Sequence, residues 1–595
     1  MKKKQSCRLL ALFVGLLLLF TACASREMPV GGQTDDTALT WNTWGGYEDF
    51  LTLAAQTYPD IEIEFTPYAG GNRTGYSWAQ MRGDDIPDFF ITSQILDEDL
   101  AKERLVDLSG YDFVNQFSTA LLDQVSIDGG VYLLPVNNAM YGIAYNKTLM
   151  EEHGWELPTN FAELEELCGE IEEAGLMPGF ISTQLTGHTF SVVFNLAKTD
   201  WLTTMEGVNW ERDFLEGNAT AAGMWEGTMD YVQKYIDIGM CNTDPEDRDN
   251  STVVNEYLYG RKAVFFMGSW SPNVTVAPET GDELGIMPYI GEDGSKNIYM
   301  YSPTSYIGIS NRLMEPGNEE KLANAVKLLT LLFSPEGQSA FINENTPYIM
   351  SVLDQATVSE NSMIYDAQQA MNEGRAFRMT YAHWESVLAD IGQVYKDWFR
   401  NENGMDGATA ITRMDEIQSS FLNAQEGVYF AESTDAFTIE ETACLAGKAL
   451  GSAVGADAAM IPYSTTYQEG VNMNPLITGR LYQERINADV AYTIVPNLDG
   501  EYAIMTMTGA QAKELAAAGF EEDGTTEPFP YVLVCKGGGE LVDDKTYQVA
   551  FLMGGYTEAV GQLYDVRVET GSFRTFLLTW LEEQGTVSPD GNVWE

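Results

Sequence analysis

Two short apolar runs separated by polar residues form the most distinctive pattern in the first part of the chain. They span residues 131–136 and 141–145 and are rich in Val, Leu, Ile and Tyr. This composition predicts two buried strands. The residues between the runs are Asn137, Asn138, Ala139 and Met140. A polar interruption between buried strands indicates a chain that leaves one hydrophobic core and enters another. We therefore expect two lobes, with Asn137 and Asn138 close to a ligand.

Strands and helices alternate at the start of the first lobe. The pattern predicts a strand at 39–44, an amphipathic helix at 47–57, a strand at 61–65 and a buried strand at 89–91. Alternation at this spacing predicts a parallel sheet with helices on its faces. Ligands of such sheets meet the loops beyond the carboxyl ends of the strands, here the loops 43–47 and 93–97.

A helix-periodic segment closes this region. Ala410, Ile411, Met414 and Ile417 recur at helical spacing within residues 407–427, and Gly427 ends the pattern. The sequence therefore predicts a domain boundary near residue 430.

Length, composition and charge limit what the chain can do. Its 595 residues are enough for about three or four domain-sized units, and 45% of them are apolar, as in folded proteins. The formal net charge of −55 repels polyanions, which excludes a nucleic-acid partner.

Metal, cofactor and redox sites are not expected. The three histidines are far apart, and the sequence has no HExxH or CxxC motif. Four cysteines outside the N-terminal segment are widely spaced, and we interpret them as free thiols, with a bridge between the last two as the alternative. These cysteines are Cys168, Cys241, Cys444 and Cys535.

The N-terminus has the features of an exported, lipid-anchored protein. A basic start precedes an apolar run at residues 9–20 that is too short to span a bilayer, which indicates a signal peptide over residues 1–22. The sequence FTAC at 20–23 resembles a bacterial lipobox, in which Cys23 would be lipidated, for example with palmitate. Residues 23–37 then form a flexible tether. An ordinary signal peptide without a lipid is the alternative.

Four segments in a fixed order resemble the bacterial extracellular solute-binding proteins of the maltose-binding type. They are TWGGYEDF, GDDIPDFF, LVDLS and DGGVYLLPVNNAMYGIAYNKTLM. Two later segments continue the resemblance: YGRKAVFFMGSW matches a strand and loop of the family, and LLTLLFSPEGQSAF at 328–341 matches its late helix–turn–helix. It covers residues 38–430 and implies a two-lobed, periplasmic-binding-protein-like (type II) α/β fold with a hinge near residues 136–142. It also implies a solute, here a carbohydrate, that closure of the lobes captures for the permease subunits of an ABC importer. No catalysis is implied.

Sites for sugars combine flat apolar surfaces with donors and acceptors for hydroxyl groups. In the resemblance, Trp270 matches a tryptophan that stacks on the ligand, and a core tryptophan is the alternative. Trp44 follows a strand and precedes two glycines, and Tyr348 follows Pro347 at the expected cleft rim. The predicted ligand-binding residues are Trp44, Gln94, Asn137, Asn138, Gln184, Trp270, Ser302 and Tyr348.

Solvated loops remain the alternative for Gln94, Gln184 and Ser302. His188 is interpreted as a structural histidine rather than a ligand group.

A second resemblance begins near residue 431. ETACLAGKALGSAVGADAAMI, MTMTGAQAKEL and LVDDKTYQVA follow the order of segments in the α+β C-terminal domain of 5′-nucleotidases. The resemblance implies a helix and strand at 443–461, a strand–turn–helix at 505–515 and a strand at 541–550. The metal-binding catalytic domain of that family has no counterpart in this chain, and Asn497 stands where the family has a base-stacking Phe. Tyr556 lies near the second stacking position. We therefore predict a structural or partner-docking module over residues 431–595.

Three functions remain open. The first is a lipid-anchored receptor on the extracytoplasmic face of the membrane that delivers a carbohydrate to an ABC transporter. The second is a nucleotidase-like or glycoside-acting hydrolase, against which the absence of a nucleophile or metal motif counts. The third is a nucleoside- or nucleotide-scavenging receptor that uses the C-terminal domain.

Overall fold

The computed structural model describes most of the chain after residue 37. The described residues are 38–43, 48–68, 70, 72–268, 274–342, 349–353, 362–378, 384–425, 429–468, 471, 473, 475–496, 501–521, 524–552, 565–570 and 572–594. The chain divides into two compact units, Met1–Ala38 and Leu39–Glu595, and only Ala38 of the first is described. The predicted signal peptide, tether and Cys23 therefore lie outside the described residues. No helix among the described residues has the length and apolar content needed to cross a membrane.

The first sheet has five strands in the order β2-β1-β3-β14-β6. β1 pairs in parallel with β2 and β3, which confirms the predicted parallel arrangement, whereas β14 is antiparallel to β3 and β6. The strands are β1 (Leu39–Thr43), β2 (Ile63–Pro67), β3 (Phe89–Thr92), β6 (Leu134–Pro135) and β14 (Tyr306–Ile309), with a hairpin of β4 (Ser126–Ile127) and β5 (Gly130–Val131).

Helices cover this sheet and share its core. The predicted helix at 47–57 is α2, and the predicted helix–turn–helix at 328–341 is the end of α12 followed by α13. Ser334 caps α13 by accepting a hydrogen bond from Gly337 N–H, and Pro335 occupies the first turn, where its missing N–H costs nothing. The helices are α2 (Glu48–Thr57), α3 (Arg73–Arg82), α4 (Glu98–Arg104), η1 (Asp112–Gln116), α5 (Thr119–Val125), η3 (Asn311–Met314), α12 (Glu319–Leu332) and α13 (Pro335–Phe341).

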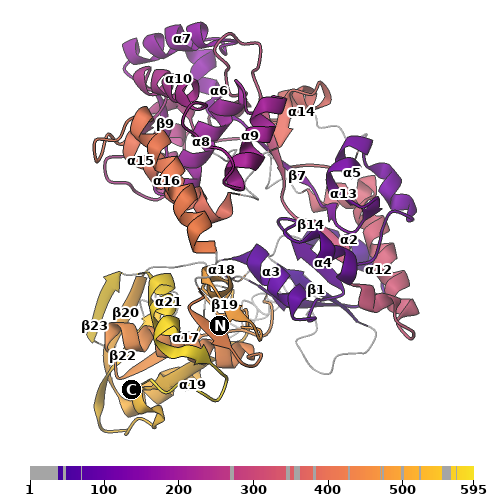
Figure 1. The fold of residues 1–595 in the computed structure, drawn as a ribbon, viewed down its shortest axis with the longest axis vertical. Helices are drawn as coiled ribbons and strands as arrows, with labels where there is room; N and C mark the ends of the chain where they lie inside the picture. The colour runs from indigo at the N-terminus through magenta and orange to yellow at the C-terminus, as the bar shows by residue number, and fades with distance from the viewer. Residues whose placement is uncertain are drawn as a thin grey trace, which may run out of the picture. The chain divides into compact units, whose positions relative to one another are not determined.

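The second sheet has the order β10-β9-β11-β8-β12 and its own hydrophobic core, which is rich in tryptophan. α15 and α16 pack against α8 and α10 (Figure 1). The strands are β8 (Ile143–Asn146), β9 (Met177–Ile181), β10 (Asn242–Thr243), β11 (Ala263–Phe266) and β12 (Leu284–Met287). The helices of this part of the chain are α6 (Lys147–His153), α7 (Phe161–Glu173), α8 (Thr186–Lys198), α9 (Met205–Leu215), α10 (Glu226–Asp237), α11 (Asn250–Val254), η2 (Asn255–Tyr259), α14 (Tyr365–Asn372), α15 (Glu385–Phe399) and α16 (Gly407–Gln425).

A third sheet is built from the segments in which the chain crosses between the first two sheets. It corrects the predicted break at residues 137–140. Residues 137–140 were expected to interrupt two strands, but β7 (Asn138–Tyr141) is itself a strand of a sheet with the order β15-β7-β13-β16. Neighbouring strands on both sides of β7 accept and donate its backbone hydrogen bonds, so the polar side chain of Asn138 does not prevent pairing. The other strands are β13 (Tyr299–Pro303), β15 (Ile349–Met350) and β16 (Ala376–Arg378).

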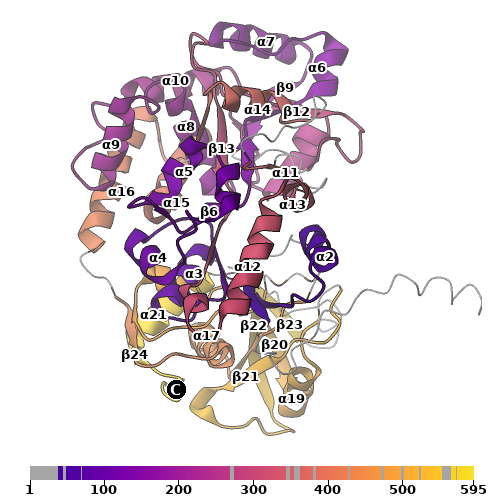
Figure 2. The same cartoon turned by 90° about the vertical axis from the view of Figure 1, so that its right-hand side faces the viewer.

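Residues after Phe430 form two further sheets, β19-β17-β24 and β21-β18-β22-β20-β23. Figure 2 shows β20, β21, β22 and β23 of the larger sheet. The predicted helix–strand pair at 443–461 and strand–helix pair at 505–515 are present as α17–β18 and β20–α19, whereas the strand predicted from 541 begins only at Thr546, after a turn.

The strands of this part are β17 (Ala431–Ser433), β18 (Ala458–Pro462), β19 (Arg485–Ile486), β20 (Glu501–Thr508), β21 (Tyr531–Cys535), β22 (Thr546–Leu552), β23 (Asp565–Thr570) and β24 (Gly585–Val587). Its helices are α17 (Ile439–Val454), α18 (Ala488–Tyr492), α19 (Gly509–Ala518), η4 (Lys536–Gly538) and α21 (Phe573–Gln584). The four cysteines expected to be free are free thiols in the structure, so Cys444 and Cys535 are not bridged.

Candidate functional site

The strands that connect the first two sheets carry three of the predicted ligand-binding residues. Asn138 pairs with Pro303 of β13 and with Met350 of β15, and Ser302 pairs with Ala139. Asn137 directly precedes β7, so the fold brings Asn137, Asn138 and Ser302 to one place. The chain passes from β6 of the first sheet through β7 to β8 of the second within about a dozen residues.

The two asparagines are held differently. The hydroxyl of Thr304 donates to Asn137 Oδ1, and the Thr304 backbone N–H donates to the Asn137 carbonyl at 3.2 Å. Asn138 is only 1% exposed, and its Oδ1 has no hydrogen-bond partner among the described residues. A buried amide oxygen without a hydrogen-bond partner lowers the stability of the fold by about 1–3 kcal/mol, the free energy of its lost hydration. Asn138 carries this cost on the strand that joins the first two sheets.

Gln94 lies in the loop beyond β3, at the carboxyl end of a parallel strand, as predicted. The indole N–H of Trp78 lies 3.0 Å from the Gln94 carbonyl oxygen and 3.1 Å from Thr92 Oγ1. A hydroxyl–hydroxyl contact between Thr74 and Ser93 also holds this loop against α3. The loop is therefore fixed by buried groups, while the Gln94 side chain remains half-buried.

The remaining predicted residues are exposed or lie outside the described residues. Gln184 is exposed in the loop between β9 and α8. Trp44, Trp270 and Tyr348 fall in segments that the structure does not describe. Gly268, two positions before Trp270, is described, and its carbonyl accepts a hydrogen bond of 2.9 Å from the buried hydroxyl of Tyr289.

Three residues that the sequence did not single out link the two sheets. Lys198, at the end of α8, donates through Nζ to the carbonyl of Arg378 at 2.9 Å, and the Arg378 guanidinium donates to the hydroxyl of Tyr306 in β14. Burial lowers the pKa of Lys198 to about 8, and the nearby Glu211 carboxylate opposes that shift. The sequence held one signal for Lys198: it directly follows the apolar stretch FSVVFNLA in a chain that has only 33 Lys and Arg residues.

His188 is buried in α8, as expected of a structural histidine. Burial lowers its pKa to about 4, so the side chain is neutral at ordinary pH. Within the described residues there is no group of three or more His, Cys, Asp or Glu arranged to hold a metal ion. The polar groups on and beside β7, β13 and β16 are amides, hydroxyls, one guanidinium and one amine, all of which form hydrogen bonds rather than metal bonds.

A model of one protein family matches residues 51–371, which is more than half of the chain. Its description is "Bacterial extracellular solute-binding protein". The chain belongs to this family. Membership gives the protein an extracytoplasmic location and a solute-binding role. The match covers the three connected sheets except for β1 and β16, which lie outside residues 51–371.

Solved structures share the fold at low sequence identity. RafE in complex with raffinose is 16% identical with a TM-score of 0.51, and the match covers 64% of this chain and 99% of RafE. The binding protein msme of Bacillus subtilis, in an open conformation, is 14% identical with a TM-score of 0.52, and the match covers 66% of this chain and 100% of msme. A chitin oligosaccharide binding protein is 17% identical with a TM-score of 0.50, and the match covers 65% of this chain and 100% of that protein.

About a third of this chain therefore lies outside these matches. A comparison with curated proteins gave no match.

Proposed function

We propose that this solute-binding protein binds a carbohydrate between the parts of the chain built on its first two sheets and delivers it to the permease subunits of an ABC importer. The family match over residues 51–371 carries this proposal. The choice of a sugar is supported by the raffinose bound to RafE and by the chitin oligosaccharide binding protein, which share the fold.

Hinge closure is the proposed mechanism of capture. Strands β7 and β13 join the two sheets, so rotation about the backbone near residues 136–142 would move one sheet relative to the other. We propose that Trp44, Trp270 and Tyr348 present flat faces to sugar rings, and that Gln94, Asn137, Asn138, Gln184 and Ser302 bond to hydroxyls. Lipidation of Cys23 would hold the receptor at the outer face of the membrane.

Residues 431–595 are proposed to be a non-catalytic module resembling the C-terminal domain of 5′-nucleotidases. The order α17–β18 followed by β20–α19 supports the resemblance. A role in nucleoside or nucleotide binding is the competing function for this module.

A binding panel tests the proposal. Calorimetric titration of the purified protein with raffinose, chitin oligosaccharides, adenosine and AMP should give saturable binding to a sugar and none to the nucleoside or nucleotide. Trp270→Ala should weaken sugar binding at least about tenfold, because a stacked aromatic ring contributes on the order of 1 kcal/mol beyond the area that it buries. Trp155→Ala is the matched control, since Trp155 stacks on His153 instead, and it should bind sugar like the wild type.

Adenosine binding without any sugar response would contradict the carbohydrate assignment. It would favour the nucleoside-scavenging function, and AMP hydrolysis would favour the hydrolase.

A further inference from the structure

One face of the first sheet's helix α3 is covered by residues from the last part of the chain. α3 and α18 contact each other (Figure 1). Tyr68 and Tyr76 stack with ring centroids 4.2 Å apart, and the ring of Tyr482 lies 6.3 Å from that of Tyr76. The three tyrosines are buried and form a cluster with Ala79. A buried aromatic cluster of this kind is typical of a specific interface.

The polar groups of these tyrosines are satisfied across the contact. The Tyr68 hydroxyl lies 2.8 Å from the Thr493 carbonyl oxygen, and the Tyr482 hydroxyl donates to Asp85 Oδ2 at 2.9 Å. Arg480 forms an ion pair with the same Asp85 carboxylate. A poorly matched surface would leave such groups unpaired at a cost of about 1–3 kcal/mol each, so the two surfaces are matched in chemistry.

Ion pairing continues at the edge of the contact. Arg82, the last residue of α3, donates through Nε at 3.2 Å and Nη2 at 3.1 Å to Glu484 Oε2. Next to the contact, a cleft of about 660 Å³ is lined on one side by Asn42 and Gln80 and on the other by Thr438 at the start of α17. Two ion pairs lie in its lining, Asp85 with Arg480 across the contact and Asp88 with Lys321 within the first part of the chain.

Shape also matches closely. A Cβ atom at Gly83 would lie 2.5 Å from the ring of Tyr482, and one at Gly479 would lie 3.2 Å from the rings of Tyr68 and Tyr76. Side chains at these positions would push the two surfaces apart.

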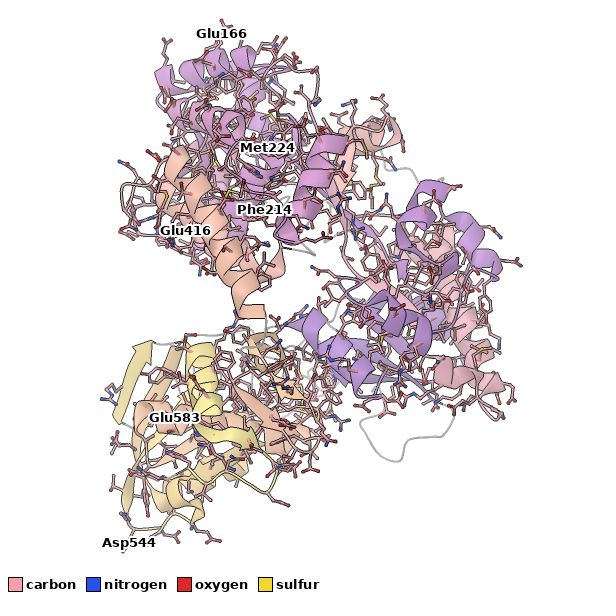
Figure 3. All side chains as sticks on the ribbon, viewed as in Figure 1. Glu166, Phe214, Met224, Glu416, Asp544 and Glu583 are labelled. Atoms are coloured by element: carbon pink, nitrogen blue, oxygen red, sulfur yellow. The ribbon has the colours of Figure 1, made fainter. Side chains whose placement is uncertain are left out.

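Residues 431–595 are also joined to the second sheet, because they follow α16 along the chain. Gln418 of α16 donates to the carbonyl of Phe214 at 3.1 Å, which holds α16 on the second sheet's core; Figure 3 labels Phe214 and, on α16, Glu416. Four residues beyond α16 the chain reaches Tyr429, whose ring lies 3.8 Å from the guanidinium of Arg485, and then Phe430, whose N–H donates to the Ile486 carbonyl oxygen. Residues 431–595 are thus linked covalently to one half of the receptor and by contacts to the other.

We propose that residues 431–595 form a strap across the hinge, so that docking on α3 and movement of the two sheets relative to each other are thermodynamically coupled. The proposal rests on the hinge motion of the proposed function. An element attached to both moving parts can make its contact in only one arrangement of them, and it stabilises that arrangement by the free energy of the contact. Releasing the contact should therefore also loosen the crossing strands β7 and β13.

Hydrogen–deuterium exchange without any solute tests this coupling. The interface variant is Arg82→Ala with Asp85→Asn, because both side chains are partly exposed and their loss leaves both cores intact. The control is Asp84→Asn, since Asp84 pairs with Arg104 inside the same half at 2.7 Å. We expect at least about threefold faster exchange in α3, in α18 and also in β7 and β13 of the interface variant, and wild-type exchange in the control.

Unchanged exchange in α3 and α18 would overturn the docking contact. Faster exchange there with unchanged β7 and β13 would overturn the coupling. Because no solute is present, both results stand even if the binding panel shows no affinity for sugars, which would contradict only the proposed function.

Discussion

His188 illustrates how burial decides the behaviour of a single residue. It lies on α8 in the interior with 2% exposure, and its pKa is lowered to about 4 by burial. The sequence interpretation as a structural histidine is in line with this position. Asn138 and Lys198 are buried in the same way, but their neighbours come from distant parts of the chain, so only the fold could identify those neighbours.

His188 makes stability depend on pH. The unfolded side chain takes up a proton below a pKa of about 6.5, whereas the folded one stays neutral until about 4, so the unfolded state binds more protons between these values. The free energy of unfolding should therefore fall by about 2 kcal/mol through this group as pH is lowered from about 7 to about 5.

Urea unfolding at both pH values measures this effect. His188→Gln should lose about 2 kcal/mol less than the wild type. His153→Gln is the control, because His153 is exposed, and it should follow the wild type. Equal losses in wild type and His188→Gln would contradict the argument.

At the scale of elements, strong periodic patterns were predicted correctly and weak ones were not. The parallel strands β1 and β3 and the helix α16 follow clear apolar patterns, whereas the α12–α13 pair was predicted from the family resemblance. β7 follows no such pattern, since Asn137 and Asn138 look like a break in the sequence. Its strand character comes from pairing with β13, which lies about 160 residues further along the chain and cannot be inferred from local pattern.

The α12–α13 corner offers a test at this scale. A Cβ at Gly337 would lie 1.8 Å from the Leu331 carbonyl oxygen, and that backbone is held in the first core. Gly337→Ala should therefore lower the free energy of unfolding by about 1–3 kcal/mol through overpacking. Gly227→Ala in α10 is the matched control, because nothing lies within 4 Å of its Cβ, and helix propensity favours alanine by up to about 1 kcal/mol.

Thermal or urea unfolding of both variants checks this prediction. Equal stability of Gly337→Ala and Gly227→Ala would show that the corner can relax around a methyl group.

For the whole molecule, charge is the dominant feature. Acidic residues such as Glu166, Glu416, Asp544 and Glu583 are exposed on several elements (Figure 3), and the chain carries a net charge of −55. Such self-repulsion favours solubility and opposes compaction.

Salt should therefore stabilise the fold. Raising NaCl from about 0.01 M to about 0.15 M shortens the Debye length from about 30 Å to about 8 Å, and the melting temperature should rise. KCl at equal ionic strength should give the same rise, because screening does not depend on the ion. A constant or falling melting temperature would contradict the argument.

Composition, local periodicity and the order of motifs along the chain are properties of the sequence. They were enough to predict an acidic, extracytoplasmic α/β receptor, its main strands and helices, and its family. The pairing of β7, the link from Lys198 through Arg378 to Tyr306, and the docking of residues 431–595 on α3 depended on tertiary structure. The contact from Tyr68 to Thr493 joins residues 425 positions apart, and no local preference encodes which distant surfaces will match in shape, hydrogen bonding and charge.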